Sequence, residues 1–265
     1  MKFSAAVFVL ALALGVATSA RGQNPSPRPD DRLVFAASGS TLTGASGGGG
    51  GAVTWLHPFS AGTLLGMGAE YQTIANSHWT LADLTGSVTL GSPSASHTSF
   101  TAELHEGSGD IGGKSFTYSI EALGASHTLE NGLTFQLEDR QIDVSTTHGN
   151  LPKIGLAYAW TPRFLTTVSY ARSSGGNLGT DISSARIDFF GKGANLLAGA
   201  AFGHAAGAVF NLETGLEQTH LTLKEVFLGV SKPLARVNVQ LVGDYLKLAD
   251  TKRATLSLVF TLPLQ

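Results

Sequence analysis

Apolar and polar side chains alternate along most of this chain, in segments of about 10 residues separated by glycine, proline and small polar residues. The last segment is the clearest example, because Leu256, Leu258 and Phe260 alternate with Thr255 and Ser257. Successive side chains of a β-strand point to opposite faces of the sheet. The period of two therefore predicts an all-β fold whose strands have one apolar and one polar face.

Counting these segments predicts about 14 antiparallel strands. Their ranges are 33–42, 52–58, 63–73, 79–90, 97–105, 115–124, 132–144, 152–161, 164–173, 181–190, 194–203, 220–231, 235–247 and 253–264. About 12 strands is the alternative, because the first two segments alternate poorly. In addition, residues 203–220 are long enough to contain another strand. An even number agrees with a closed barrel whose two ends lie on the same side of a membrane.

The connections are of two kinds. Tight turns are expected at Trp160–Arg163, Phe190–Gly193 and Ser231–Leu234, and longer loops of small residues at Gly39–Gly51, Ser173–Thr180 and Gly203–Gln218. Membrane barrels have short periplasmic turns and longer outer loops, so the turns at Pro162 and Pro233 are expected on the periplasmic side.

Aromatic residues gather near the strand ends beside the tight turns, at Trp55, Tyr158, Trp160 and Phe164, with others further along the strands at Tyr71, Trp79, Tyr170 and Tyr245. Tyrosine and tryptophan are enriched at the two water interfaces of a membrane, because their rings are apolar and their O–H and N–H groups need a hydrogen-bond partner such as water. The positions therefore favour a membrane barrel over its structural alternative, a soluble β-domain.

The chain starts with a secretory signal pattern. Lys2 precedes an uncharged apolar run over 5–17, and small residues follow up to Ala20, so residues 1–22 are expected to be a cleaved signal peptide. Residues 23–32 contain three prolines and no apolar side chain, which predicts a flexible lead-in. The barrel domain is expected over 33–265.

Composition narrows the function classes. The chain has 33 glycines, 14% charged residues and no cysteine, so it has neither disulfides nor thiolate metal sites. A formal charge of −2 without a basic block argues against a nucleic-acid partner. Past residue 20 no uncharged apolar run reaches the roughly 18 residues of a spanning helix. A membrane location would therefore require a barrel.

Together, the signal pattern, the period-two segments and the apolar closing strand resemble a Gram-negative outer-membrane β-barrel. Its size and its alternation of proline turns with glycine-rich loops are similar to YaiO-type barrels, a family associated with exopolysaccharide systems. The resemblance implies an outer-membrane location, with outer-membrane lipids and the barrel-insertion machinery as partners. One departure is the ending Phe260-Thr261-Leu262-Pro263-Leu264-Gln265, since such barrels usually end on the Phe or Trp that this machinery recognises.

Charged residues on the polar faces are candidates for lining the lumen. We expect there Glu103, Glu121, Glu138, Arg140, Arg186, Asp188 and Asp244, together with His105 and Lys224. Both signs are present, so these residues would form either an ion-paired core or a pore lining. About 14 strands is enough for a narrow aqueous space.

Candidate catalytic residues are His97, Ser99 and Glu103, with His105 and Ser108 as a second set. Residues two apart in a strand share a face, so His97 and Ser99 could meet, and an acid could orient the imidazole as in lipid acyl hydrolases. The remaining histidines are scattered, so no metal or other cofactor is expected. The glycine run Gly47–Gly51 lacks the Lys-Ser or Lys-Thr of a phosphate loop.

The sequence therefore predicts a non-enzymatic barrel, either a channel or an accessory protein of the envelope or of exopolysaccharide secretion, with polysaccharide or small solutes as its cargo. A lipid-active barrel enzyme of the acyl hydrolase type and a soluble periplasmic β-domain are the alternatives.

Overall fold

The computed structural model describes residues 30–75, 77–92, 96–111, 113–144, 147–211 and 215–264. The predicted signal peptide, and all but the last residues of the predicted lead-in, lie outside these ranges. Among the residues that the structure describes, none belongs to a helix long and apolar enough to cross a membrane.

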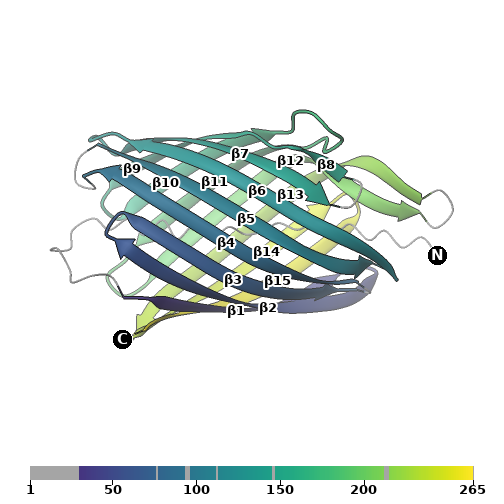
Figure 1. The fold of residues 1–265 in the computed structure, drawn as a ribbon, viewed down its shortest axis with the longest axis horizontal. Helices are drawn as coiled ribbons and strands as arrows, with labels where there is room; N and C mark the ends of the chain where they lie inside the picture. Colours follow the sequence, from purple (N-terminus) through teal and green to yellow (C-terminus); the bar gives the residue numbers. More distant parts are fainter. Residues whose placement is uncertain are drawn as a thin grey trace.

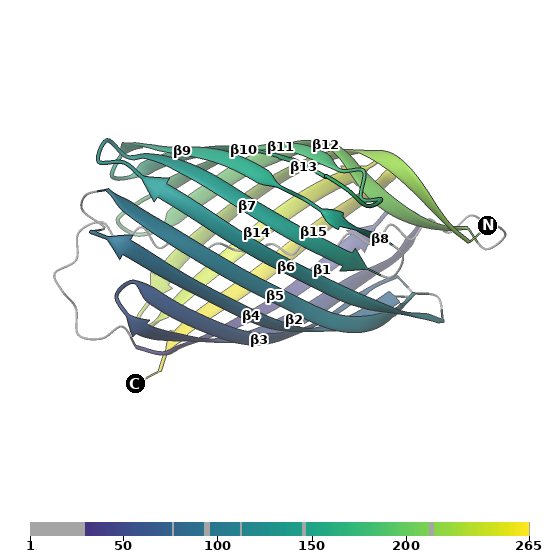
Figure 2. The ribbon, with the colours of Figure 1, turned by 45° about the horizontal axis from the view of Figure 1, so that its top comes forward.

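The strands are β1 (Arg32–Leu42), β2 (Ala45–Ser60), β3 (Thr63–Ile74), β4 (Ser77–Gly91), β5 (His97–Ile111), β6 (Lys114–Thr128), β7 (Leu133–Val144), β8 (Thr147–Asn150), β9 (Lys153–Thr161), β10 (Phe164–Arg172), β11 (Asp181–Phe190), β12 (Asn195–Asn211), β13 (Gly215–Leu234), β14 (Val237–Leu248) and β15 (Thr251–Pro263). Each pairs antiparallel with its neighbour, and β1 pairs with β15 from Arg32↔Pro263 to Leu42↔Arg253. The sheet therefore closes on itself, as Figures 1 and 2 show.

Strands β8 and β9 are two parts of one wall position. Both pair with β7, β9 along Leu133–Glu138 and β8 along Gln141–Val144. Between them Leu151 and Arg140 exchange backbone hydrogen bonds of 2.7 and 3.4 Å. Pro152, which has no N–H, interrupts the strand. The wall is a closed antiparallel barrel of 14 strands, which confirms the predicted fold and strand number.

The two faces of the wall differ in chemistry. On β6, Phe116, Tyr118 and Ile120 are buried, while the intervening positions are exposed or half-buried. Elsewhere the exposed face is strongly apolar, and its large side chains include Phe100, Leu123, Leu137, Ile154, Leu156, Leu228 and Leu256. In a closed barrel the buried face is the inner one, so the outer surface carries the apolar side chains. That arrangement suits contact with lipid.

The two ends of the barrel also differ. The end that holds Arg32 and Pro263, called here the terminal end, carries turns such as Pro162–Arg163 and Gly191–Ala194. The first lies within the predicted turn Trp160–Arg163, and the second is shifted by one residue from the predicted turn Phe190–Gly193. At the opposite, far end lie the loop between β10 and β11, where a longer connection was predicted, and the hairpin of β12 and β13, which projects beyond its neighbours (Figures 1 and 2).

The third predicted turn is displaced. Pro233 pairs with Asn238 inside the β13–β14 ladder, and the chain turns at Ala235 and Arg236. Ala235 adopts a positive φ of 54°, which suits a tight two-residue hairpin. Pro233 tolerates its place because it lies at the strand end, where one ladder hydrogen bond is easily lost.

Two predicted loops are strands. The glycines of Gly47–Gly51 lie in β2, and the chain turns earlier, at residues 43–44. A Cβ on Gly50 would lie 2.7 Å from the carbonyl oxygen of Tyr71 on β3, so glycine permits a close approach of these strands. The predicted loop Gly203–Gln218 is likewise mostly the β12–β13 hairpin, paired as far as Asn211↔Gly215.

The predicted aromatic girdle is present in part. Tyr158 and Trp160 lie on the exposed face of β9 near the terminal end, with ring centroids 4.9 Å apart. The indole of Trp160 donates to the Thr166 hydroxyl at 2.9 Å. Trp55 shares the outward face of β2 with Val53 and donates to Asp31 at 3.1 Å. Trp79 does not belong to the girdle, because its side chain is buried inside the barrel.

Candidate functional site in the barrel interior

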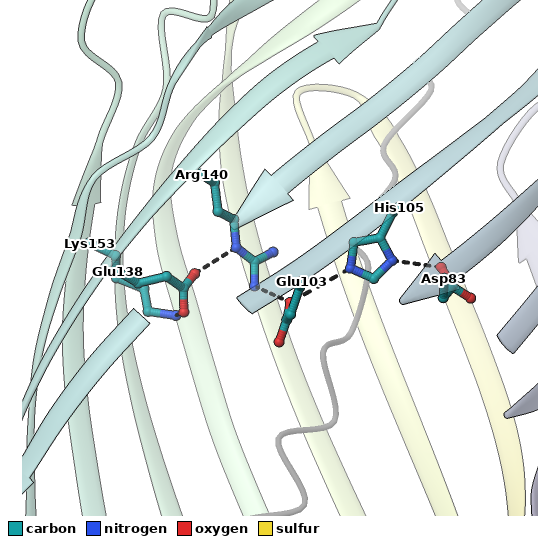
Figure 3. Close-up of polar contacts among 6 residues, drawn as sticks. All are labelled: Asp83, Glu103, His105, Glu138, Arg140 and Lys153. Carbon is teal, nitrogen blue, oxygen red and sulfur yellow. Dashed lines mark hydrogen bonds and ion pairs between the residues drawn. The ribbon is translucent and has the colours of Figure 1, made fainter. Parts of the chain in front are cut away.

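A row of ionisable side chains crosses the inner wall from β4 to β9, and we call it the ion-paired belt: Asp83, His105, Glu103, Arg140, Glu138 and Lys153 (Figure 3). At one end Lys153 Nζ donates to Glu138 Oε2 at 2.8 Å, and Arg140 Nε donates to the other oxygen of Glu138 at 2.6 Å. These short contacts between opposite charges fix the geometry of Arg140.

The other half of the belt centres on His105. Its Nδ1 lies 2.6 Å from Asp83 Oδ1, and its Nε2 lies 3.6 Å from Glu103 Oε2. Arg140 Nη2 lies 3.7 Å from that same Glu103 oxygen. Glu103 therefore links the two halves through longer contacts than those at either end.

Strand register explains the belt. Asp83 and His105 are directly opposed on β4 and β5, and Glu138 opposes Lys153 across β7 and β9. Between Glu103 and Arg140 the register places Ala122 of β6. Because Ala122 is small, the Arg140 guanidinium reaches past it to Glu103. Sequence spacing alone does not bring these residues together, since the contact depends on the pairing of three strands.

An apolar cluster adjoins the belt toward the far end. It consists of Trp79, Leu81, Phe116, Tyr118 and Ile120, with Ile74 and Ile142 packed against it. Trp79, Leu81 and Asp83 follow one another on the inner face of β4, so the cluster passes directly into the belt. Within the described part of the chain, neither the Trp79 indole N–H nor the Tyr118 hydroxyl has a hydrogen-bond partner. Two buried polar groups thus lie unpaired within an otherwise apolar cluster.

The opposite wall repeats this order. Ala201, Leu223, Leu246 and Leu248 form a second apolar cluster near the far end. Charged residues follow deeper in the barrel: Glu225 is buried, and Arg253 Nη2 lies 3.9 Å from Asp244 Oδ2. Arg186 Nε donates to both oxygens of Asp188 at 3.0 and 2.9 Å. The inner wall therefore has an apolar zone near the far end and a charged zone below it.

Comparison with known proteins agrees with this architecture. No protein-family model and no curated protein sequence matches the chain. Among solved structures, the CymD monoaromatic hydrocarbon channel superposes with a TM-score of 0.61 at 10% identity, over 90% of each chain. The Pseudomonas putida toluene transporter TodX gives a TM-score of 0.55 at 11% identity, over 98% of this chain and 95% of that chain. The chain therefore shares the antiparallel β-barrel fold of these outer-membrane proteins. The finer resemblance to YaiO-type barrels stays a prediction.

Within this barrel two predicted lumen residues lie on the wrong face. Glu121 is exposed on the outer face of β6, and Lys224 is exposed on the outer face of β13. The prediction that they line the lumen is wrong. On β6 the apolar side chains of Phe116, Tyr118 and Ile120 point inward and complete the apolar cluster, so the polar face with Glu121 points outward. The remaining predicted lumen residues lie on the inner face, at Glu103, Glu138, Arg140, Arg186, Asp188, Asp244 and His105.

The candidate catalytic residues do not form a nucleophile arrangement. The Ser99 hydroxyl is 2.8 Å from that of Thr89, and Glu103 contacts His105 and Arg140. Glu103 is four residues from Ser99 along β5, roughly 13 Å in an extended strand. In the second set, Ser108 is exposed on the outer face, opposite to the face of His105. Ser99 is therefore separated from Glu103, and Ser108 from His105.

Proposed function

We propose that the protein is a non-enzymatic channel of the outer membrane that passes small solutes with an apolar part through its lumen. The observation that carries this proposal is the order of the inner wall, in which the apolar cluster around Trp79 and Tyr118 leads from the far end into the ion-paired belt.

The apolar cluster suits an aromatic or short aliphatic solute. Such a body matches in chemistry the aromatic and apolar side chains of Trp79, Phe116 and Tyr118, which point into the barrel. CymD and TodX, which share the fold, are channels for monoaromatic hydrocarbons by name. The shared architecture and the aromatic lining together favour this solute class.

The charged zone of the inner wall favours cations among charged solutes. Within the described mid-barrel interior, the acids Glu70, Asp83, Glu103, Glu138, Asp188, Glu225 and Asp244 outnumber the bases Arg140, Lys153, Arg186 and Arg253. Acidic side chains in a pore lining attract cations and repel anions. The proposed channel therefore selects solutes mainly by their contact with the aromatic side chains and secondarily by their charge.

Solute flux tests the proposal. The folded barrel is reconstituted into vesicles, and entry of a small phenol is compared with entry of a sugar of similar mass. The substitution Trp79→Ala should slow phenol entry several-fold and leave sugar entry nearly unchanged. Trp160→Ala, on the outer face, is the matched control and should alter neither rate. Equal loss of both solutes in Trp79→Ala, or no entry through the unaltered barrel, would overturn the proposal.

The outer-membrane location is tested by fractionation. We expect the protein in the outer-membrane fraction, with the heat-modifiable gel mobility of a folded barrel. Recovery in the osmotic-shock fluid would instead favour the soluble periplasmic domain. Loss of export after replacing the apolar run over 5–17 would support the proposed signal peptide.

A further inference from the structure

Three lysines lie side by side on the outer surface of β13, β14 and β15. Lys224 is directly opposed to Lys247, and Lys247 is directly opposed to Lys252. Directly opposed side chains have Cβ atoms roughly 4.5–5.5 Å apart. We call these three residues the lysine row. All three side chains are exposed, while their chain neighbours Leu223 and Leu246 are buried inside the barrel.

The lysine row lies at the edge of the apolar outer surface that is nearest to the far end of the barrel. On β15 the outward positions below Lys252 are all apolar: Ala254, Leu256, Leu258, Phe260 and Leu262. The stretch spans nine residues, roughly 30 Å along the strand and close to the ~25 Å apolar band of a membrane barrel once strand tilt is included. On β13 and β14 the next outward pair below the row, Val226 and Tyr245, is also exposed and apolar.

The row is at the far end of the barrel. Lys247 and Lys252 flank the turn of residues 249–250 between β14 and β15, at the end opposite to Arg32 and Pro263. The longest described connection, between β10 and β11, is at this same end. Longer loops mark the outer side of a membrane barrel. The lysines therefore lie at the level of the headgroups of the outer leaflet.

No acid among the described residues neutralises the lysine row. Among the described residues none of the three lysines forms an ion pair. The acid nearest in sequence is Asp250 in the adjoining turn, while Glu225 and Arg253 point to the inner side. Like charges directly opposite one another disfavour strand pairing. Three in a row therefore point to a multiply charged anion outside the protein that compensates them.

We propose that Lys224, Lys247 and Lys252 form a binding site for the phosphate groups of a phosphorylated glycolipid of the outer leaflet, with its acyl chains on the apolar surface below. The exposed rings and aliphatic side chains of Tyr245, Val226 and Leu256 supply that surface. Ammonium groups bind phosphate as point charges and suit a flexible headgroup. The inference rests on the membrane location proposed above, and it is independent of conduction through the lumen.

Lipid binding by the folded full chain tests the site. The probe is bisphosphorylated lipid A added to the barrel in detergent, with bound lipid counted by native mass spectrometry. Replacing all three lysines by glutamine should weaken binding on the order of 100-fold, and Lys247→Gln alone roughly fivefold. Replacing all three by arginine should preserve binding, because the charge is kept. The matched control is Lys232→Gln, an exposed residue of β13 near the terminal end, which should have no effect.

Two further measurements distinguish a lipid-borne phosphate from free phosphate as the bound group. Lipid A without its phosphates should bind as weakly to the unaltered barrel as lipid A does to the triple glutamine variant. Inorganic phosphate at millimolar concentration should not displace the lipid, since the acyl chains contribute to binding. Unchanged binding in the triple glutamine variant, or full displacement by inorganic phosphate, would overturn the proposal. A chain that does not enter detergent micelles or vesicles at all would instead refute the membrane location.

Discussion

Replacing Arg140 by methionine tests the geometry of the ion-paired belt. Methionine keeps much of the length of the side chain and removes its charge. Arg140 and Glu138 have 17% and 22% exposed side chains and a 2.6 Å contact, so the pair is nearer to the buried than to the surface case. Removing one partner of a buried pair costs about 3–5 kcal/mol, and an exposed pair contributes about 0–1 kcal/mol. Lys153 still compensates Glu138 at 2.8 Å. We therefore expect a loss of about 2 kcal/mol.

A double-mutant cycle separates the two partners of Arg140. With Glu138→Gln we expect a coupling of about 1–2 kcal/mol, because a charged hydrogen bond joins the two side chains. With Glu103→Gln we expect less than about 0.5 kcal/mol, because the 3.7 Å separation exceeds a hydrogen bond.

The assay is equilibrium unfolding in urea from lipid vesicles, followed by tryptophan fluorescence and by gel mobility of the folded form. Coincidence of the two probes is needed for a two-state free energy. A coupling of Arg140 with Glu103 equal to or larger than that with Glu138 would refute the described belt. An Arg140→Met variant as stable as the unaltered barrel would do so as well.

Three further changes follow from packing and register. Ala122→Leu should separate Arg140 from Glu103 and lower stability by about 1–3 kcal/mol through overpacking, measured by urea unfolding; an unchanged midpoint would contradict the close approach over β6. Gly50→Ala should destabilise the β2–β3 pair by about 1–3 kcal/mol, because the added Cβ meets the backbone of β3. The control Gly39→Ala, with open space around its Cβ position, should change stability by less than about 0.5 kcal/mol. Equal effects of the two variants in the same unfolding assay would count against the close approach of β2 and β3. Leu228→Lys should lower the free energy of folding into vesicles by about 2–4 kcal/mol if this exposed leucine faces lipid, and a smaller loss than about 1 kcal/mol would argue that it does not.

Much of the barrel wall was predictable because the alternating faces of a strand appear in the sequence as alternating apolar and polar residues. The boundaries of two strands, Phe164–Arg172 and Asp181–Phe190, are correct to within a residue, whereas β5 and β6 extend six and four residues beyond the ends predicted for them, 105 and 124. Tight turns with proline or glycine also mark the strand ends. Glycine is common both in loops and in strands that approach each other closely, so the sequence does not tell the two apart. Gly47–Gly51 was predicted as part of a loop, but these glycines lie in β2 and permit its close contact with β3.

The interior was less predictable. Alternation separates two faces without stating which is inner, and β6 carries its apolar residues inward, so Glu121 was placed on the wrong side. The contacts of Arg140 depend on the register of β5, β6 and β7 and on the size of Ala122, which no local pattern encodes. The lysine row is equally invisible along the chain, because its members are neighbours only across strands.

Ion current through the single barrel tests the central claim most directly. The folded full chain is inserted into a planar lipid bilayer, and current is recorded under a potassium chloride gradient. The proposed channel should give stepwise currents with a reversal potential on the cation-selective side, and Glu138→Gln should move that potential toward zero. A correctly folded barrel that inserts into the bilayer without stepwise current would contradict the channel function.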